Sequence, residues 1–548
     1  MAAFGVVVFT WPLVLQPTDL YGHVQGEASN HLWMFWRAGV SGPVANYPVG
    51  LPIPLMDPVN LPVYRSLAWV HPALGYNAVW CFNLGAAFWG ALFLSRALGV
   101  SRMASVSAGV ACAFSPFLSG LGSFGITESW GVGWLGFHLA FVLRYSESGR
   151  KRDLCGAAVF LGAFLYTGWY SAVFAVIAEI GVAVFLWRRG RLGAGFLVQG
   201  FAAAVLVLPR LVSFWKERQF WADRWVGVPT PLEGQWEPWR ELPRSGADAL
   251  NLVLPSVGAV PVSKSVYLGL IVLGLAIYAG KKARVLWVWA VPFLVLSLGT
   301  HLMIGGHQNF GGVSVSLPAD WIRSLVPPLE GLTHWYRALG PAILFLAVAA
   351  AMGVERLSSR YPKAVVVLPV LIFLEGLILS QTPWPRALVS IEPPSVYESL
   401  SRDGALLQLP LHNNRREFTS DEPRVYNRWQ PMHGLSVVEN YEGSDALLDR
   451  NPWVEELQGL CVQGRPMLLS LAEQQMWSKE LRKQGVQQVV VHGVAGRELP
   501  DAWQCGEPHE GSATRQKQAD RVVDALEAVG AQVILHSGGD TALGWTSP

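Results

Sequence analysis

The chain has 548 residues, of which 51% are hydrophobic and only 15% are charged, whereas a soluble domain carries about 25% charged residues. The charge is unevenly placed: residues 381–548 hold 15 basic and 22 acidic residues, while residues 1–380 are sparsely charged and net basic. This composition excludes a purely soluble enzyme, and the 25 Trp and long apolar runs exclude collagen-like, coiled-coil and disordered proteins. The acidic tail contains no run of Lys and Arg, so no nucleic acid partner is expected.

Apolar segments recur along the first 380 residues and predict about 11 transmembrane helices. Several are shorter than the roughly 20 residues that cross a ~30 Å hydrocarbon core, so tilt or local thinning must make up the difference. The first segment also has the composition of a signal peptide, but no small-residue cleavage site follows it, and we interpret it as a retained helix. The segments are 1–16, 75–95, 104–118, 129–143, 154–166, 170–186, 193–209, 265–279, 285–299, 338–354 and 364–380.

The Lys and Arg residues between these segments predict the orientation. With a cytoplasmic N-terminus, the short inside loops hold 15 basic residues, whereas the much longer outside loops of the membrane half hold 11. An odd number of spans then places the C-terminal tail on the non-cytoplasmic side. The large loops 17–74, 210–264 and 301–336 face the same side, so any chemistry is expected there.

The tail, 382–548, begins with a Pro-rich linker and is predicted to form a small extracytoplasmic α/β domain. Strand-like runs cover 405–411, 486–492 and 531–536, and helical runs cover 467–484 and 513–529. The tail shows no phosphate-binding loop, nucleophile elbow or metal-ligand spacing, which favours an acceptor-binding or structural module. Cys461 and Cys505 fit two interpretations, a disulfide or two buried thiols.

The first outside loop holds the candidate base. Read as a helix from Glu27, the sequence places His31 on the same face, with Trp33 and Trp36 suited to the lipid headgroup level. A carboxylate above the membrane can deprotonate an acceptor hydroxyl, and His31 could orient it. The alternative is an interfacial helix with a solvated polar face. Asp19, directly after the first span, is a second candidate base.

Other acids have two interpretations each. Asp57 precedes Pro58 and fits a turn, although it could also serve as the base. Glu128 could line the same cavity, or it could be an acid favoured at a helix start. Glu179 and Glu375 lie inside apolar segments, where a partner on a neighbouring helix could satisfy them.

Three Arg or His residues at outer ends of predicted spans are candidates for binding the phosphate of a lipid-linked donor. They are Arg210, His301 and Arg337. Arg binds phosphate bidentately, which suits a fixed site at membrane depth. The alternative for Arg337 is interfacial snorkelling beside Trp335 and Tyr336.

The chain resembles bacterial polytopic proteins of the GT-C glycosyltransferase superfamily through short motifs spread along its length. These are Gly26-Glu27 before Trp33 and Trp36, Asp57-Pro58, Gly75-Tyr76-Asn77, Phe114-Ser115-Pro116-Phe117 and Tyr336-Arg337.

The resemblance implies a sugar transferred from a polyprenyl-phosphate donor to an extracytoplasmic acceptor, with Glu27 or Asp19 as the base. This sequence has Glu where related loops more often carry Asp, and it lacks an adjacent acidic pair, which weakens a metal-dependent interpretation. Some members use a divalent cation and others none, and no ligand cluster in the sequence decides between them. Two other functions stay open, a non-catalytic scaffold or envelope-assembly protein and a lipid-linked glycan transporter.

Overall fold

The chain folds into two compact units in the computed structural model. The structure describes residues 2–23, 26–41, 57–225, 246–255, 265–310, 313–326, 332, 334–409, 425–438, 451–493, 505, 512–537 and 539–545. The first unit, here the helical unit, comprises Met1–Ala28 and Pro54–Val389, and the second, here the sheet unit, comprises Ser29–Ile53 and Ser390–Pro548. The linker predicted to start at 382 therefore begins within the helical unit, where β4 (Leu388–Val389) pairs antiparallel with β1 (Leu20–Tyr21).

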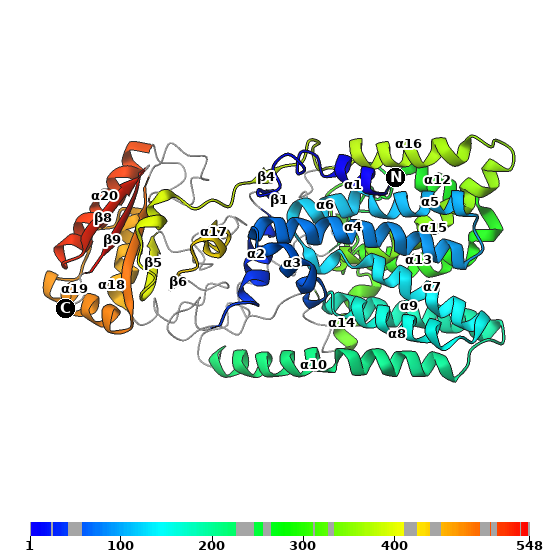
Figure 1. Cartoon of the computed structure of the whole chain (residues 1–548), viewed down its shortest axis with the longest axis horizontal. Helices are drawn as coiled ribbons and strands as arrows, with labels where there is room; N and C mark the ends of the chain where they lie inside the picture. Colours follow the sequence, from blue (N-terminus) through cyan, green and yellow to red (C-terminus); the bar gives the residue numbers. More distant parts are fainter. Residues whose placement is uncertain are drawn as a thin grey trace. The chain divides into compact units, whose positions relative to one another are not determined.

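A helix lies in each of the eleven predicted apolar segments, and Figure 1 shows these helices side by side in a bundle. Among the described residues, five candidate spans are long and apolar enough to cross a membrane: Pro72–Ala97, Arg102–Phe124, Trp169–Arg188, Ala194–Ser213 and Trp335–Ser358. The number of crossings stays a prediction. The helices are α1 (Ala2–Phe9), α4 (Pro72–Ala97), α5 (Arg102–Ala113), α6 (Pro116–Phe124), α7 (Val132–Ser148), α8 (Lys151–Leu165), α9 (Trp169–Arg188), α10 (Ala194–Trp225), α12 (Leu270–Tyr278), α13 (Arg284–Ser297), α15 (Leu339–Ser358) and α16 (Ala364–Ile378).

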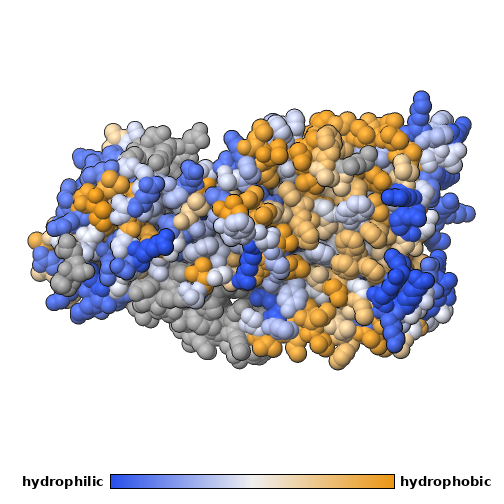
Figure 2. Space-filling view, in the orientation of Figure 1, coloured by the Kyte–Doolittle hydropathy of each residue, from blue (hydrophilic) through white to orange (hydrophobic). Residues whose placement is uncertain are grey.

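The surface of the bundle has the pattern of a membrane protein. Figure 2 shows hydrophobic residues over its side and hydrophilic residues gathered at its right-hand end. Large apolar side chains such as Ile180 on α9 and Phe201 on α10 are exposed, which in water would be a large unfavourable surface. Lipid is the solvent that removes this cost.

Close helix packing in the bundle depends on small residues. A Cβ atom at Gly90 of α4 would lie 2.2 Å from the carbonyl oxygen of Gly133 of α7, and one at Gly133 would lie 2.3 Å from the backbone of Ala86. Glycine at these positions lets the two backbones touch, as small residues do at helix contacts in membranes.

The predicted span 104–118 is divided into two helices by its sequence. The Ser115 hydroxyl accepts a hydrogen bond from the Leu118 amide, and Pro116 occupies the first helical position of α6. Pro lacks an amide to continue α5, while Ser and Pro together favour the start of a new helix. α6 then ends at Gly125, which has a left-handed backbone conformation.

Both acids inside apolar segments have partners. Glu375 of α16 accepts hydrogen bonds from the Tyr267 hydroxyl at 2.8 Å and from the Leu270 amide at 2.7 Å. Glu179 of α9 contacts His138 of α7 and accepts from Gln199 Nε2 of α10 at 3.3 Å. These contacts satisfy buried polar groups and hold helices together, which accounts for both residues without a catalytic role.

Shorter elements connect the helices. They are α3 (Leu61–Ala68), α14 (Pro318–Leu325), the antiparallel strands β2 (Asn309–Phe310) and β3 (Val313–Ser314), and the 3₁₀ helices η1 (Pro58–Asn60), η2 (Thr127–Ser129), η4 (Gly280–Ala283) and η6 (Trp335–Ala338).

The sheet unit contains a five-stranded mixed sheet in the order β6-β5-β7-β9-β8. β5 is parallel to β6 and β7, while β9 is antiparallel to β7 and β8. The predicted strands correspond to β5, β7 and β8, and the predicted helices to α19 and α20. The elements are η7 (Ser395–Ser399), β5 (Ala405–Leu409), α17 (Val425–His433), β6 (Ser436–Val437), α18 (Pro452–Gln463), α19 (Leu471–Lys483), β7 (Val486–His492), α20 (Ser512–Ala528), β8 (Gln532–Ser537) and β9 (Asp540–Gly544).

Part of the predicted first outside loop, Ser29–Ile53, also belongs to the sheet unit. α2 (Ala28–Arg37) contributes Trp33, whose indole N–H donates to the side-chain oxygen of Gln430 in α17. Trp33 is therefore buried in protein, which corrects its predicted place at the lipid headgroups. An indole N–H buried in this way needs an acceptor, and Gln430 supplies it.

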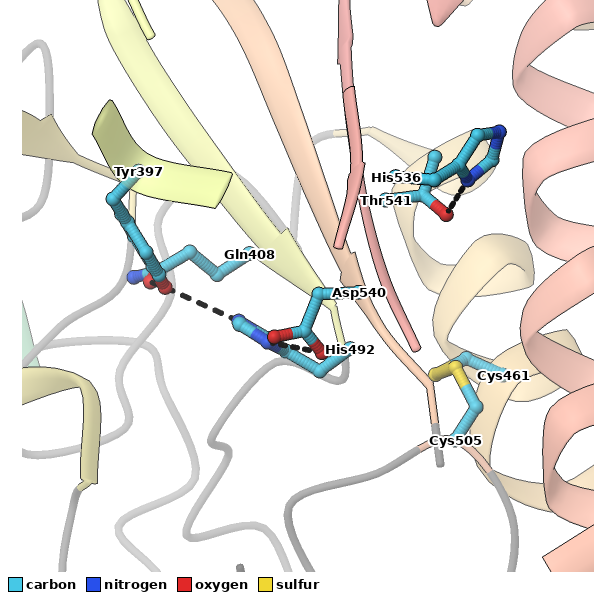
Figure 3. Close-up of polar contacts among 8 residues, drawn as sticks. All are labelled: Tyr397, Gln408, Cys461, His492, Cys505, His536, Asp540 and Thr541. Atoms are coloured by element: carbon cyan, nitrogen blue, oxygen red, sulfur yellow. Dashed lines mark hydrogen bonds and ion pairs between the residues drawn. A yellow bond between two sulfur atoms is a disulfide. The ribbon is translucent and has the colours of Figure 1, made fainter. Parts of the chain in front are cut away.

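A buried polar chain crosses the strand ends of the sheet unit (Figure 3). The Tyr397 hydroxyl of η7 bonds Gln408 of β5 and lies 3.1 Å from His492 Nε2 of β7. His492 Nδ1 in turn lies 3.3 Å from a carboxylate oxygen of Asp540 in β9. Burial lowers the pKa of His433 to about 3, so this ring is neutral where it stacks on Tyr397. The chain fastens the end of the linker to the sheet.

A disulfide joins Cys461 of α18 to Cys505, so the disulfide is the correct one of the two predicted interpretations. It links α18 to the segment after β7, where the Cys505 amide donates to the His492 carbonyl oxygen at 3.0 Å.

We expect the double substitution Cys461→Ser and Cys505→Ser to destabilise the sheet unit by about 2–4 kcal/mol, because the unfolded chain regains the entropy of an open loop. The measurement is the melting temperature of the purified full-length protein under non-reducing conditions. Cys155→Ser, at an exposed free cysteine, is the control that should melt like the wild type. Equal melting temperatures for all three proteins would show that the bridge contributes nothing.

Candidate functional site

Asn77 of α4 fixes the start of the first outside loop. Its side-chain amide donates to the carbonyl oxygens of Pro17 at 3.0 Å and Asp19 at 2.7 Å, and its oxygen accepts from the Tyr21 amide at 3.0 Å. One buried Asn thereby satisfies three backbone groups that would otherwise be unpaired at the end of the bundle. The half-buried Asp19 is held here by its carbonyl group.

The segment that carries Glu27 packs against the end of α6. The His23 amide donates to the Ser123 carbonyl at 2.7 Å, and the Glu27 amide donates to the Phe124 carbonyl at 2.5 Å. A Cβ atom at Gly26 would lie 2.6 Å from the Phe124 oxygen, and one at Gly125 would lie 2.3 Å from the Ala28 nitrogen. Two glycines therefore permit the approach that places Glu27 at this end of the bundle.

Glu128 and Arg337 form a buried ion pair. Arg337 Nη1 donates to Glu128 Oε1 at 2.7 Å, and the two side chains are 8% and 6% exposed. Glu128 lies in η2, directly after α6, and Arg337 lies in η6, directly before α15. The guanidinium also stacks over the Tyr170 ring, 4.8 Å from its centroid. Each charge neutralises the other at a depth where a single charge would be costly.

Three acids lie within electrostatic range of Tyr76 of α4: Asp57, Glu128 and Glu27. Glu128 and Glu27 are also within electrostatic range of Arg337. Asp57 is buried and accepts from Asn60 Nδ2 at 3.3 Å. We therefore treat Glu27, Asp57, Glu128 and Arg337 together as the candidate site, in which Glu128 and Arg337 are in direct contact.

An aromatic cluster adjoins Tyr76. Tyr21 stacks on Trp80 with ring centroids 5.7 Å apart, Trp80 lies 4.6 Å from Trp130, and Trp130 lies 5.8 Å from Tyr76. Burial raises the pKa of Tyr21, which lies outside the spans, so this ring keeps its proton.

Several hydrogen-bond donors in this cluster and in η6 are buried but lack an acceptor among the residues that the structure describes. They include the Tyr76 hydroxyl and the indole N–H groups of Trp80, Trp130 and Trp335. Buried donors normally have a partner, so a ligand rich in acceptor oxygens would complete the site.

The structure describes other contacts for the remaining predicted site residues. Arg210 of α10 lies over the Trp169 ring at 5.8 Å. The described contacts of His301 are with Thr300, at 3.2 Å between Nδ1 and Oγ1, and with Ser316 by strand-like pairing. His31 is buried in the sheet unit and Glu27 belongs to the helical unit, so their pairing stays a prediction. α2 begins at Ala28, one residue after Glu27.

Sequence reasoning gave no role to Asn77, Trp130 or Tyr170. The sequence could have indicated a role for Asn77, because an Asn inside an apolar segment needs hydrogen-bond partners. It could not have indicated one for Trp130 or Tyr170, since aromatic residues are common at span ends whether or not they line a site.

The described residues contain no group of three or more His, Cys, Asp or Glu side chains that could hold a metal ion.

No protein-family model and no curated protein matches the sequence. Solved structures do match it: the arabinofuranosyltransferase AftD from Mycobacteria is 14% identical with a TM-score of 0.51, over 100% of this chain and 39% of that chain. ArnT from Cupriavidus metallidurans in the apo state is 12% identical with a TM-score of 0.50, over 99% of this chain and 98% of that chain. The chain thus spans 39% of the length of AftD.

AftD and ArnT are both GT-C glycosyltransferases. The chain accordingly has the GT-C fold, as its sequence motifs predicted, and it is a helical multi-pass membrane protein with a C-terminal α/β domain.

We expect Glu128→Gln or Arg337→Gln alone to destabilise the helical unit by about 3–5 kcal/mol, because each leaves a buried charge without its partner. The double variant should lose less free energy of unfolding than the two single variants lose together, because it leaves no buried charge without a partner. Thermal unfolding of the four proteins in one detergent measures this double-mutant cycle. Additive losses would contradict a coupled pair.

Proposed function

We propose that the protein is an integral-membrane glycosyltransferase that moves a sugar from a polyprenyl-phosphate donor to an acceptor on the non-cytoplasmic side. The observation that supports this most is the buried Glu128–Arg337 ion pair, beside which the Tyr76 hydroxyl and the Trp335 indole have no acceptor among the described residues. The half-buried Glu27 lies within electrostatic range of this pair. The site lies at one end of an apolar bundle with the GT-C fold, where a membrane-anchored carrier could present its phosphate. AftD, which shares this fold, is an arabinofuranosyltransferase.

In the proposed reaction, Glu27 accepts the proton of the acceptor hydroxyl. The acceptor oxygen then bonds to the anomeric carbon of the sugar, while the bond between that carbon and the phosphate oxygen breaks. The bonding electrons leave with the polyprenyl phosphate, which gains one negative charge. Glu27 suits the role of base because its backbone amide donates to the carbonyl oxygen of Phe124, which lies four residues before Glu128 of the ion pair. Asp19 is the second candidate.

The leaving phosphate needs hydrogen-bond donors that are already in place. Arg337 gives one N–H to Glu128 and has others in its planar fork. The Tyr76 hydroxyl and the Trp130 and Trp335 indoles supply donors that no described residue uses. Donors fixed before the reaction stabilise developing charge without a cost of reorganisation. Arg210 and His301 are proposed as further contacts to the donor.

The central test is turnover of purified protein with labelled polyprenyl-phosphate sugars. Turnover supports the transferase, whereas its absence with intact donor binding favours the scaffold. Movement of the lipid-linked glycan across a proteoliposome membrane without transfer favours the transporter.

We expect Glu27→Gln to lower turnover by roughly 10²-fold or more while donor binding stays intact, because the amide cannot accept the proton. Asp19→Asn is the matched control, a neutralised acid in the same segment, and should cost less. Donor binding is measured alongside in Arg337→Ala, which should bind the donor more weakly.

A near wild-type rate in Glu27→Gln would transfer the base to Asp19. Wild-type rates in both variants would remove both acids from the mechanism. Unchanged donor binding in Arg337→Ala would remove Arg337 from the phosphate site.

We also expect the C-terminus to lie on the non-cytoplasmic side, because basic residues concentrate in the short loops of the opposite side. Alkaline phosphatase fused after Pro548 should be active in cells, because this enzyme folds only outside the cytoplasm. Green fluorescent protein fused at the same position should not fluoresce, because it does not fold into its fluorescent form when it is exported unfolded. The reverse result would overturn the orientation.

A further inference from the structure

Helix α14 (Pro318–Leu325), between α13 and η6, presents an apolar face that no described residue covers. Trp321 is 56% exposed and Leu325 is 78% exposed, and the two residues are one helical turn apart on the same face. Val326, directly after the helix, and Val313 and Val315, at strand β3, are exposed as well. Soluble surfaces rarely gather large apolar side chains in this way.

The opposite side of α14 is fastened to the helical unit. Ala319 is fully buried, and α14 packs against α13. The Ser316 hydroxyl donates to Asp320 at 2.8 Å, and the Leu317 amide donates to the Thr300 carbonyl at 2.8 Å. The apolar face is therefore held outward by defined contacts.

The loop before α14 is anchored by Asp248. Its carboxylate accepts from the amides of Gly306 at 2.6 Å, Gly305 at 3.1 Å and Leu250 at 2.8 Å. A carboxylate that ties two separate stretches together keeps the loop in one position relative to the ends of the helices.

The position of α14 along the chain indicates its surroundings. It follows the end of α13 at Ser297 and precedes the candidate span that begins at Trp335, so it lies at an end of the bundle, as Figure 1 also shows. Trp is the residue type favoured where hydrocarbon gives way to headgroups.

We propose that α14 lies in the outer leaflet of the bilayer at the headgroup level, with Trp321 and Leu325 directed toward the acyl chains. A short helix with one apolar face binds a membrane surface in this way. The inference rests on the proposed orientation but not on the proposed activity.

Depth-dependent quenching tests the proposal in full-length protein reconstituted in phosphatidylcholine bilayers. The background carries Cys155→Ser, which removes the exposed free thiol. A bimane label is attached to Leu325→Cys, and its fluorescence is compared in bilayers with phosphatidylcholine doxyl-labelled at acyl carbon 5 or 12. Ile180→Cys on α9 is the control for deep lipid contact, and Lys483→Cys on α19 is the control for a polar surface.

At Leu325→Cys we expect at least about twofold stronger quenching by the 5-doxyl than by the 12-doxyl lipid, because the label sits near the headgroups. Ile180→Cys should show the opposite order, and Lys483→Cys should not be quenched. No quenching at position 325 would overturn the proposal and indicate that water, the sheet unit or a second copy occupies this face. Stronger quenching by the 12-doxyl lipid would also overturn it, because α14 would then lie deeper than the interface.

Turnover of labelled polyprenyl-phosphate sugar by the same labelled proteins separates this inference from the proposed function. Active protein without quenching refutes only the placement of α14. Inactive wild-type protein with the expected quenching refutes only the activity.

Discussion

The burial of Glu128 against Arg337 is the constraint around which the candidate site is arranged. At an exposed fraction below a tenth, neither charge could stay ionised alone without a large cost in free energy. The two residues come from opposite halves of the membrane region, so the pair forms only when η2 and η6 reach their places. The elements that carry them, α6 before η2 and α15 after η6, are for this reason fixed relative to each other.

α6 connects the pair to the first outside loop. Its start is set by Ser115 and Pro116, and its end by the left-handed Gly125. The carbonyl oxygen of Phe124 at that end accepts a hydrogen bond from the Glu27 amide, and Glu128 lies three residues after Gly125. One short helix thereby positions two acids, Glu27 and Glu128, that are 101 residues apart in the chain. A change that moved the end of α6 would displace both acids together.

The sequence predicted the helices well because hydrophobicity is a local property that each apolar segment carries by itself. It predicted β5, β7 and β8 for the same reason, but it missed β9, a short strand after a glycine pair that only its neighbours make recognisable. The Glu128–Arg337 contact joins residues far apart in the chain, so no local sequence pattern predicts it. Trp33 was misplaced because an exposed indole at a membrane surface and a buried one paired to Gln430 look alike in sequence.

The sheet unit offers a second buried polar cluster. The ends of β5 and β7 meet the start of β9 at one edge, which is where ligands commonly bind in α/β folds. At this edge the Tyr397 hydroxyl bonds Gln408 and lies 3.1 Å from His492 Nε2, and His492 Nδ1 lies 3.3 Å from Asp540. Both units hold buried polar groups without a hydrogen-bond partner among the described residues, so hydrogen-bond satisfaction does not distinguish them. The proposed chemistry is assigned to the helical unit because the Glu128–Arg337 ion pair lies at the end of an apolar bundle, where a membrane-anchored donor would arrive.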